Sequence, residues 1–130
     1  MCLSKLGDFK VSQNYGWQIY FKAHTGKLFS RYYCFNNPIS VGKWQRDTFR
    51  IFNRWIYIHH ISDLKYRKGY HIFLNKNDAK DYLLGCSECC VKKVRFKRIL
   101  HQGFQRVYNR EKIPRYAKVV ACRYRYVEPD

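Results

Sequence analysis

The three clustered cysteines Cys86, Cys89 and Cys90 carry the most specific chemical signal in this chain. Two thiolates three positions apart can bind one zinc ion through a tight turn, and zinc prefers a tetrahedral set of Cys and His ligands. The sequence holds no second Cys-x-x-Cys and no matching His pair, so the other ligands must be isolated residues. We therefore expect a structural zinc ion on Cys86 and Cys89, with Cys90 as a substitute and Cys34 as a third ligand.

Two other interpretations of these cysteines stay open. Free cysteines are among the most buried residue types, so the thiols can simply belong to the core, as we expect for Cys122. Alternatively, Cys86 and Cys89 form a redox dithiol. Such a pair usually lies at a helix N-terminus, where the dipole favours thiolate, whereas these cysteines follow the expected end of a helix.

Residues with catalytic spacing are missing from the sequence. A zinc deaminase needs His or Cys, then Glu two residues on, together with Pro-Cys-x-x-Cys, but Gly85 precedes the cysteine motif and His71 is followed by Ile72 and Phe73. Only nine acids are present, with no spacing typical of a carboxylate pair, and there is no Gly-rich phosphate loop. We expect a protein that is not an enzyme and has no small-molecule substrate.

The formal net charge of +17 is spread along the chain. Such a charge usually indicates a polyanionic partner, most often nucleic acid. Lys and Arg alternate with Tyr at several places, a pattern that suits single-stranded DNA or RNA because cations neutralise phosphates while rings stack on bases. We expect the partner to contact Arg123, Arg125, Lys65, Arg67, Lys68, Lys97 and Arg98.

The strands and the helix that must position these residues are expected to form one α+β domain over residues 1–130. Alternation and β-prone composition predict five or six mostly antiparallel strands, at residues 17–23, 28–35, 54–61, 70–74, 91–99 and 117–127. One short helix follows the cap Asn75, with Asp78 reaching back, and ends at Gly85 before a Cys-rich knuckle. Residues 101–103 read as a turn and 104–112 as a polar loop. The last strand, apolar on both faces at its middle, is expected to be central.

The N-terminus has no signal-peptide core, and no apolar run is long enough to cross a membrane. We therefore expect a protein of the host cell cytosol that does not bind membranes. Disulfides are disfavoured in that reducing compartment, so the six cysteines are expected to be reduced.

Four segments carry a resemblance: GYHIF, NDAKDYL, VKKVRFKRIL and YAKVVACRYRYVEP. Together they resemble small uncharacterised proteins of phages and mobile elements. A compact, cysteine-rich, strongly charged protein of this type is similar in kind to anti-CRISPR inhibitors, including zinc-containing inhibitors of Cas9-type effectors. The resemblance implies binding to a host effector protein, its guide RNA or the nucleoprotein complex, which blocks target DNA loading. The charge of +17 excludes mimicry of DNA.

Two alternatives accompany this interpretation. The first is a plain module that binds single-stranded DNA or RNA. The second is an atypical transferase, because the Gly-aromatic strand, the helix with Ala and Tyr, and the Val-rich strand resemble part of the ADP-ribosyltransferase fold. Those enzymes keep a catalytic Glu near a late strand, where this chain offers Glu111 in a loop and Glu128 beside Pro129.

Overall fold

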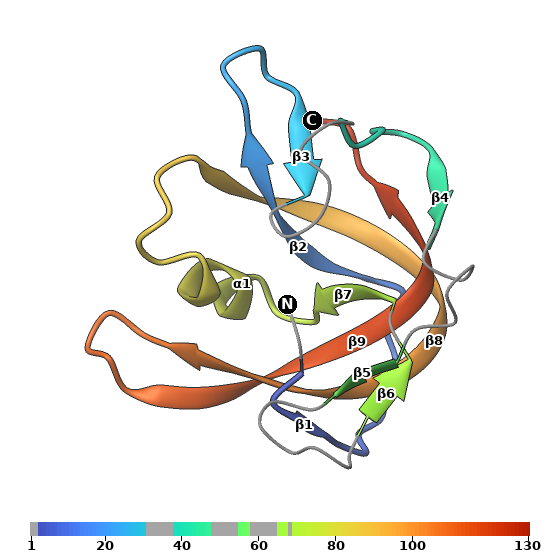
Figure 1. Cartoon of the computed structure of the whole chain (residues 1–130), viewed down its shortest axis with the longest axis vertical. Helices are drawn as coiled ribbons and strands as arrows, with labels where there is room; N and C mark the ends of the chain where they lie inside the picture. The colour runs from blue at the N-terminus through green and yellow to red at the C-terminus, as the bar shows by residue number, and fades with distance from the viewer. Residues whose placement is uncertain (1–2, 31–37, 48–54, 58–64, 68) are drawn as a thin grey trace.

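The computed structural model describes residues 3–30, 38–47, 55–57, 65–67 and 69–130 (Figure 1). These residues form strands and one short helix in the order β1 (Lys5–Leu6), β2 (Tyr15–Lys22), β3 (Leu28–Ser30), β4 (Trp44–Arg46), β5 (Trp55–Tyr57), β6 (Lys65–Arg67), β7 (Tyr70–Phe73), α1 (Lys76–Tyr82), β8 (Cys89–Tyr108) and β9 (Pro114–Val127). The predicted class, a mostly antiparallel sheet with one short helix, is confirmed.

The main sheet has seven strands and folds back on itself. Strand β8 pairs with β2, β2 with β7, β7 with β9, and β9 again with β8, so these four strands pair in a closed circuit. Strands β1, β3 and β4 extend it, and β5 pairs with β6 in a separate small sheet. The prediction of five or six strands is therefore too low, because elements as short as β1 and β4 are too brief to show alternation.

The long pair β8 and β9, here called the ribbon, dominates the architecture. Its register runs from Val94↔Val127 to Tyr108↔Pro114 and shifts between Ile99 and His101. Arg98 lies just before the shift with a φ of 57°, and such a bulge bends a strand and increases its twist. The bend lets the first half of β8 pair with β2 while the second half continues along β9.

This bend corrects one sequence prediction. Residues 101–103 are not a turn, and residues 104–108 are not part of a loop, since all of them lie in β8 and pair with β9. The bulge interrupts the alternation of apolar and polar residues, which made one long strand read as a strand followed by a loop. The predicted central position of the last strand is confirmed, because Val119, Val120, Ala121 and Cys122 are fully buried in β9.

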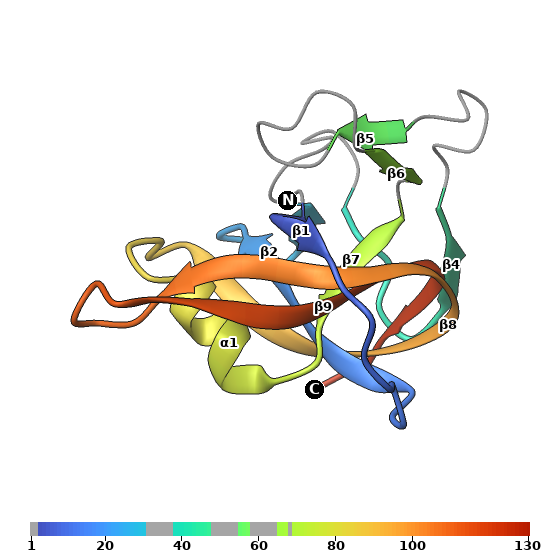
Figure 2. The same cartoon turned by 90° about the horizontal axis from the view of Figure 1, so that it is seen from below.

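Two apolar clusters form the core. One lies between α1 and the ribbon and includes Phe73, Ala79 and Val119. The other includes Tyr20 and Val120. Figure 2 shows α1 on one side of the ribbon and the small sheet of β5 and β6 on the other. The helix is thus held against the sheet by its apolar face.

Helix α1 begins as predicted, with one difference. The Asn75 side chain caps it by accepting a 2.8 Å hydrogen bond from the Asn77 N–H. The Asp78 carboxylate, expected to reach back to the cap, instead accepts a hydrogen bond from Arg115 of β9. Gly85, after the helix, has the expected left-handed conformation with a φ of +89°. The difference at Asp78 arises because a guanidinium is a stronger partner for a carboxylate than a backbone amide.

Candidate nucleic-acid interface

One surface of the sheet brings together aromatic and basic side chains from four strands. Direct cross-strand pairing puts Tyr15, Arg95, Tyr126 and Trp44 in one row over β2, β8, β9 and β4. Residues that lie directly opposite in a sheet share a face, as do residues two apart along a strand. We call this surface the aromatic–cation platform and define it as Tyr15, Trp44, Arg46, Arg95, Lys97, Tyr124 and Tyr126.

The second row of the platform lies two residues along each strand. Lys97 of β8 is opposite Tyr124 of β9, which is opposite Arg46 of β4. The platform therefore alternates aromatic and basic residues both across and along the strands. No segment of the sequence shows this arrangement, because it is assembled by pairing between strands.

Cations lie against the rings of the platform. The Lys97 Nζ is 3.9 Å from the centroid of the Trp44 ring, and the Arg95 Cζ is 5.2 Å from that of Tyr126. The rings of Trp44 and Tyr126 are 5.6 Å apart at a tilt of 51°. These distances are those of cation–π and aromatic contacts.

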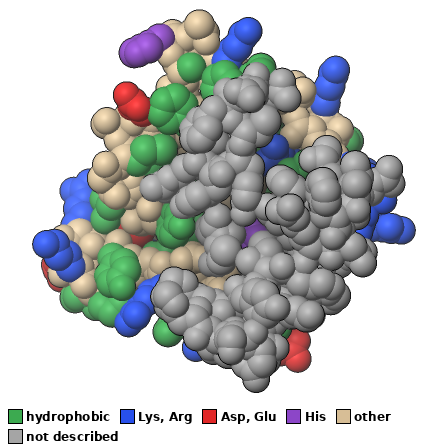
Figure 3. Space-filling model, in the orientation of Figure 1, with side chains coloured by type: hydrophobic (Ala, Val, Ile, Leu, Met, Phe, Trp, Pro, Cys, Tyr) green, Lys and Arg blue, Asp and Glu red, His purple; other side chains and the backbone are tan. Residues whose placement is uncertain are grey.

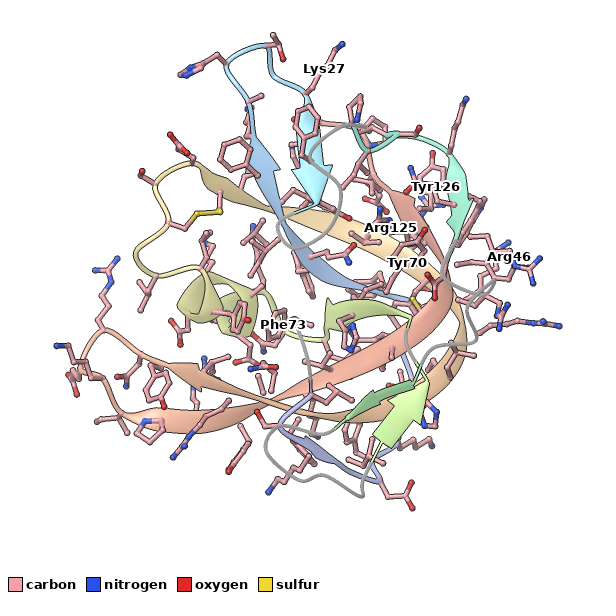
Figure 4. All side chains as sticks on the ribbon, viewed as in Figure 1. Lys27, Arg46, Tyr70, Phe73, Arg125 and Tyr126 are labelled. Carbon is pink, nitrogen blue, oxygen red and sulfur yellow. A yellow bond between two sulfur atoms is a disulfide. The ribbon has the colours of Figure 1, made fainter. Side chains whose placement is uncertain are left out.

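Part of this aromatic surface faces solvent. Trp44 is 42% exposed and Tyr15 is 38% exposed, while Tyr126 is half-buried. Figure 4 shows Arg46 and Tyr126 on the side of the molecule where β4 runs along the end of β9. The exposed rings beside cations thus offer a surface on which the bases of an anionic strand can stack.

The opposite face of the same strands holds a buried arginine. Arg125 is 8% exposed, and its Nε donates to the Gln45 Oε1 at 2.9 Å while its Nη1 donates to the Gln18 Oε1 at 3.1 Å. Its Cζ lies 4.0 Å from the centroid of the Tyr70 ring and 5.6 Å from that of Tyr20. Figure 4 shows Arg125 and Tyr70 side by side, on the inner side of the closed circuit of strands.

This burial corrects the sequence prediction for Arg125, which was expected on an exposed face. Alternation along β9 puts Arg125 and Tyr126 on opposite faces of the sheet, and the face that carries Tyr126 is the outer one in the structure. The strand closes a circuit with β2 and β7, so the side that looked polar in the sequence points inward and is satisfied by glutamine oxygens and rings. Arg125 thus supports the platform from behind.

Burial also sets the ionisation of this interior cluster. Loss of hydration raises the pKa of the Tyr20 and Tyr70 hydroxyls, although the nearby Arg125 guanidinium acts in the opposite direction. Burial raises the pKa of the Cys122 thiol to about 12. These three groups are therefore neutral at pH 7, and Arg125 is the cation among them.

The remaining predicted partner-binding residues fall in different places. Lys97 lies in the platform, Arg98 is exposed at the bulge next to it, and Arg123 is half-buried on β9. Only the backbone of Lys65 and Arg67 is described, in β6, and Lys68 lies outside the described residues. Their role in binding stays a prediction.

Two central platform residues were missed by sequence reasoning. Trp44 and Arg46 belong to β4, whereas the sequence around them reads as a short edge strand or loop followed by a polar turn. The available signal was the spacing of an aromatic and a cation two residues apart, which is the spacing of one face of a strand.

The Cys-rich knuckle contains a disulfide. Cys86 and Cys89 are joined, with their Cα atoms 5.5 Å apart, whereas reduced thiols were expected. The turn brings the two cysteines within the usual Cα–Cα range of a disulfide. Cys90 is free and half-buried, and burial raises its pKa. The prediction that Cys122 lies in the core is confirmed.

The zinc ion stays a prediction. Cys34 lies outside the described residues, and within residues 3–30, 38–47, 55–57, 65–67 and 69–130 no group of three or more Cys, His, Asp or Glu side chains is placed to hold a metal. A disulfide also has to be reduced before Cys86 and Cys89 can act as thiolate ligands.

The two glutamates of the transferase alternative lie at opposite ends of β9. Glu128 follows the strand and accepts a 3.0 Å hydrogen bond from the Arg95 Nε. Glu111 lies in the turn before it, where its N–H donates to the Asn109 Oδ1. The structure thus puts one glutamate beside the platform and the other at the far tip of the ribbon.

No protein-family model, curated protein or solved structure matches this chain. In the described part of the chain, no helix is long and apolar enough to cross a membrane.

Proposed function

We propose that this protein binds single-stranded nucleic acid on the aromatic–cation platform and catalyses no reaction. The observation that carries the proposal is the two-row arrangement of Tyr15, Trp44, Tyr124 and Tyr126 among basic residues on one outer face. Proteins that bind single strands combine a positive surface that follows the backbone with rings on which bases stack.

The charge of the platform favours an anion. Arg46, Arg95 and Lys97 contribute three positive charges, and within the described residues the carboxylate paired with them is Glu128, on Arg95. A phosphate is a stronger partner for Lys97 than the Trp44 ring is, because a charged hydrogen bond exceeds a cation–π contact. Binding would therefore move the cation to a phosphate and leave the ring for a base.

Inhibition of a host defence effector is a second candidate, supported by the same charge. A basic platform suited to single strands also suits the guide RNA of a Cas9-type complex. The two candidates differ in what binds the isolated protein. A nucleic-acid-binding module binds naked oligonucleotides, whereas an inhibitor of this type binds the effector complex far more tightly.

The test is a titration of fluorescent oligouridine and oligodeoxythymidine of about 12 nucleotides, read by anisotropy at several salt concentrations. We expect binding that weakens steeply with salt, because phosphate contacts release counterions. Trp44→Ala should weaken binding by about fivefold or more, from a stacking loss of about 1–3 kcal/mol per base. The double variant Arg46→Glu with Lys97→Glu should abolish measurable binding.

Lys27→Glu with Lys80→Glu is the matched control. It changes the net charge equally, but Lys27 lies in the turn between β2 and β3 and Lys80 on α1, away from the platform (Figure 4). Equal weakening by both double variants would show that total charge, not the platform, drives binding. Oligonucleotides that fail to bind, together with tight binding of an effector complex, would favour inhibition.

A further inference from the structure

A cavity of about 540 Å³ lies between the C-terminal end of α1 and the tip of the ribbon. Its volume is within the range of small-molecule sites, about 300–1,000 Å³. The residues that carry the argument are Tyr82 and Leu84 on one side and Val107, Arg110 and Lys112 on the other. None of them belongs to the platform, and Figure 1 shows the two regions at different ends of the molecule.

The charge of the cavity lining is positive. Arg106, Arg110 and Lys112 contribute three cations, and the one acid in the lining is Asp81. The Asp81 carboxylate accepts a 2.5 Å hydrogen bond from the Arg115 Nη2, which compensates its charge in part because Arg115 also pairs with Asp78. Figure 3 shows basic side chains mixed with hydrophobic ones at the left of the molecule, where the ribbon ends. The lining therefore favours an anionic ligand.

The walls of the cavity are aromatic and apolar. Leu84 is 47% exposed and offers apolar surface to a ligand. The Tyr82 ring packs against Phe73 with centroids 5.5 Å apart, which fixes its orientation. An oriented ring of this kind offers a stacking surface for a base.

The turn that carries two of the cations is ordered by side-chain hydrogen bonds. The Asn109 Oδ1 accepts from the N–H groups of Glu111 and Ile113 at 2.9 and 3.0 Å, and Lys112 has a φ of 63°. Asn commonly fixes turns in this way. The backbone of Arg110 and Lys112 is therefore fixed at the rim before a ligand arrives, which lowers part of the entropic cost of binding.

We propose that this cavity binds one phosphorylated nucleoside, with the base against Tyr82 and Leu84 and the phosphate on Arg110 and Lys112 of the turn. The choice of ligand class rests on the proposed nucleic-acid binding. A free mononucleotide and the phosphorylated end of a bound strand share this chemistry. The cavity thus adds a second site to the platform, one that recognises a single nucleotide unit.

The test is NMR titration of the isotope-labelled full chain with uridine and adenosine monophosphates, and separately with the nucleosides and inorganic phosphate. We expect the monophosphates to shift the amides of residues 82–85 and 106–112, at an affinity about tenfold or more above either part alone. Arg110→Ala with Lys112→Ala should reduce that affinity by about tenfold. Lys27→Ala, in the turn between β2 and β3 and outside both regions, should leave it unchanged.

The two sources of ligand are separated by oligouridines with a 5′-phosphate, a 3′-phosphate or neither. A phosphorylated strand that binds tighter than the bare one, with the difference lost in Arg110→Ala with Lys112→Ala, supports a strand end. Equal affinities, with mononucleotide shifts at the cavity, support a free nucleotide. If the monophosphates shift no cavity amide, the cavity proposal is overturned, whatever the platform binds. If no strand binds but the monophosphates still shift the cavity amides, only the proposed platform function is overturned.

Discussion

The platform and the cavity use the same kinds of residue on different foundations. Behind the platform lies Arg125, which is 8% exposed and held by two glutamines and two tyrosines. Beside the cavity, α1 is tied to the ribbon by ion pairs from Arg115, whose side chain is 40% exposed, to Asp78 and Asp81. The proposed platform is thus supported by a buried polar network, and the proposed cavity site by one partly exposed arginine that two carboxylates share.

This difference has a physical consequence. Buried polar networks are costly to disrupt, because a broken partner stays desolvated. Ion pairs near the surface are weakened by water and salt. We therefore expect the platform to keep its shape over a wide range of salt, and the cavity to be the more adjustable of the two.

The largest expected effect comes from removing the buried cation. Arg125→Gln should lower the free energy of unfolding by about 2–4 kcal/mol, because Gln18 and Gln45 lose hydrogen bonds to a charged group and two rings lose a cation. Urea denaturation measures this. Arg123→Gln, two residues away and half-buried, is the matched control and should cost about 0.5 kcal/mol or less. Equal stability of Arg125→Gln and wild type would show that the cluster gives the platform no support.

Alkaline pH should weaken the same foundation. Burial raises the pKa of Cys122 from its ordinary 9 to about 12 and raises that of Tyr20 as well. The unfolded chain loses these protons first, so stability is fully present below pH 9 and falls as the pH rises. The free energy of unfolding should drop by about 1.4 kcal/mol per pH unit above pH 9 for Cys122, and Tyr20 should add to the drop only above pH 10.

Urea denaturation at pH 8, 9 and 10 tests the pH dependence. In Cys122→Ala the absolute stability changes, but the decrease between pH 9 and pH 10 should be smaller than in wild type. A wild-type stability that stays constant up to pH 10 would contradict the burial of these groups.

The sequence predicted some features of the fold and not others. The fold class, the cap at Asn75 and the burial of β9 follow from local patterns, and the structure confirms them. The face of β9 that points inward does not. Alternation shows that Arg125 and Tyr126 lie on opposite faces, but only the closure of the sheet through β2 and β7 decides which is inside.

Both sites depend on long-range pairing that no local pattern contains. Trp44 and Lys97 are far apart in the sequence and meet because β4 and β8 both pair with β9. The cavity depends on the part of β8 that follows the bulge at Arg98, which extends the strand beyond its predicted end and carries Val107 to α1. Basic and aromatic composition predicted a kind of partner, while the topology defines where it would bind.

Reduction of the disulfide should affect the cavity side alone. Gly85 lines the cavity and Cys86 follows it directly. Opening so short a loop should lower the free energy of unfolding by about 1–2 kcal/mol, measured by denaturation with and without a phosphine reductant. The Cys86→Ala with Cys89→Ala variant should be insensitive to the reductant. An equal decrease in oligonucleotide affinity at the platform would contradict the separation of the two regions.

The reduced protein also provides the test of the zinc prediction. Elemental analysis after purification under reducing conditions should give about one zinc per chain, and the double variant at Cys86 and Cys89 should lose it. Reduced wild type that contains no zinc and is as stable as the oxidised form would refute the site.

The smallest expected effect on stability, and the sharpest test of the comparison, is Arg115→Ala. The Arg115 side chain is 40% exposed but that of Asp78 is only 13% exposed, so the loss should cost about 1 kcal/mol, more than a fully exposed pair, because a nearly buried carboxylate loses its partner. Mononucleotide affinity should nevertheless fall about threefold or more, because Asp81 would then present an unpaired negative charge to the ligand phosphate. Asp81→Asn in the same background removes that charge and should restore the affinity, and oligonucleotide binding at the platform should be unchanged throughout. An Arg115→Ala variant that weakens both regions equally would mean that α1, the ribbon and the platform respond as one unit.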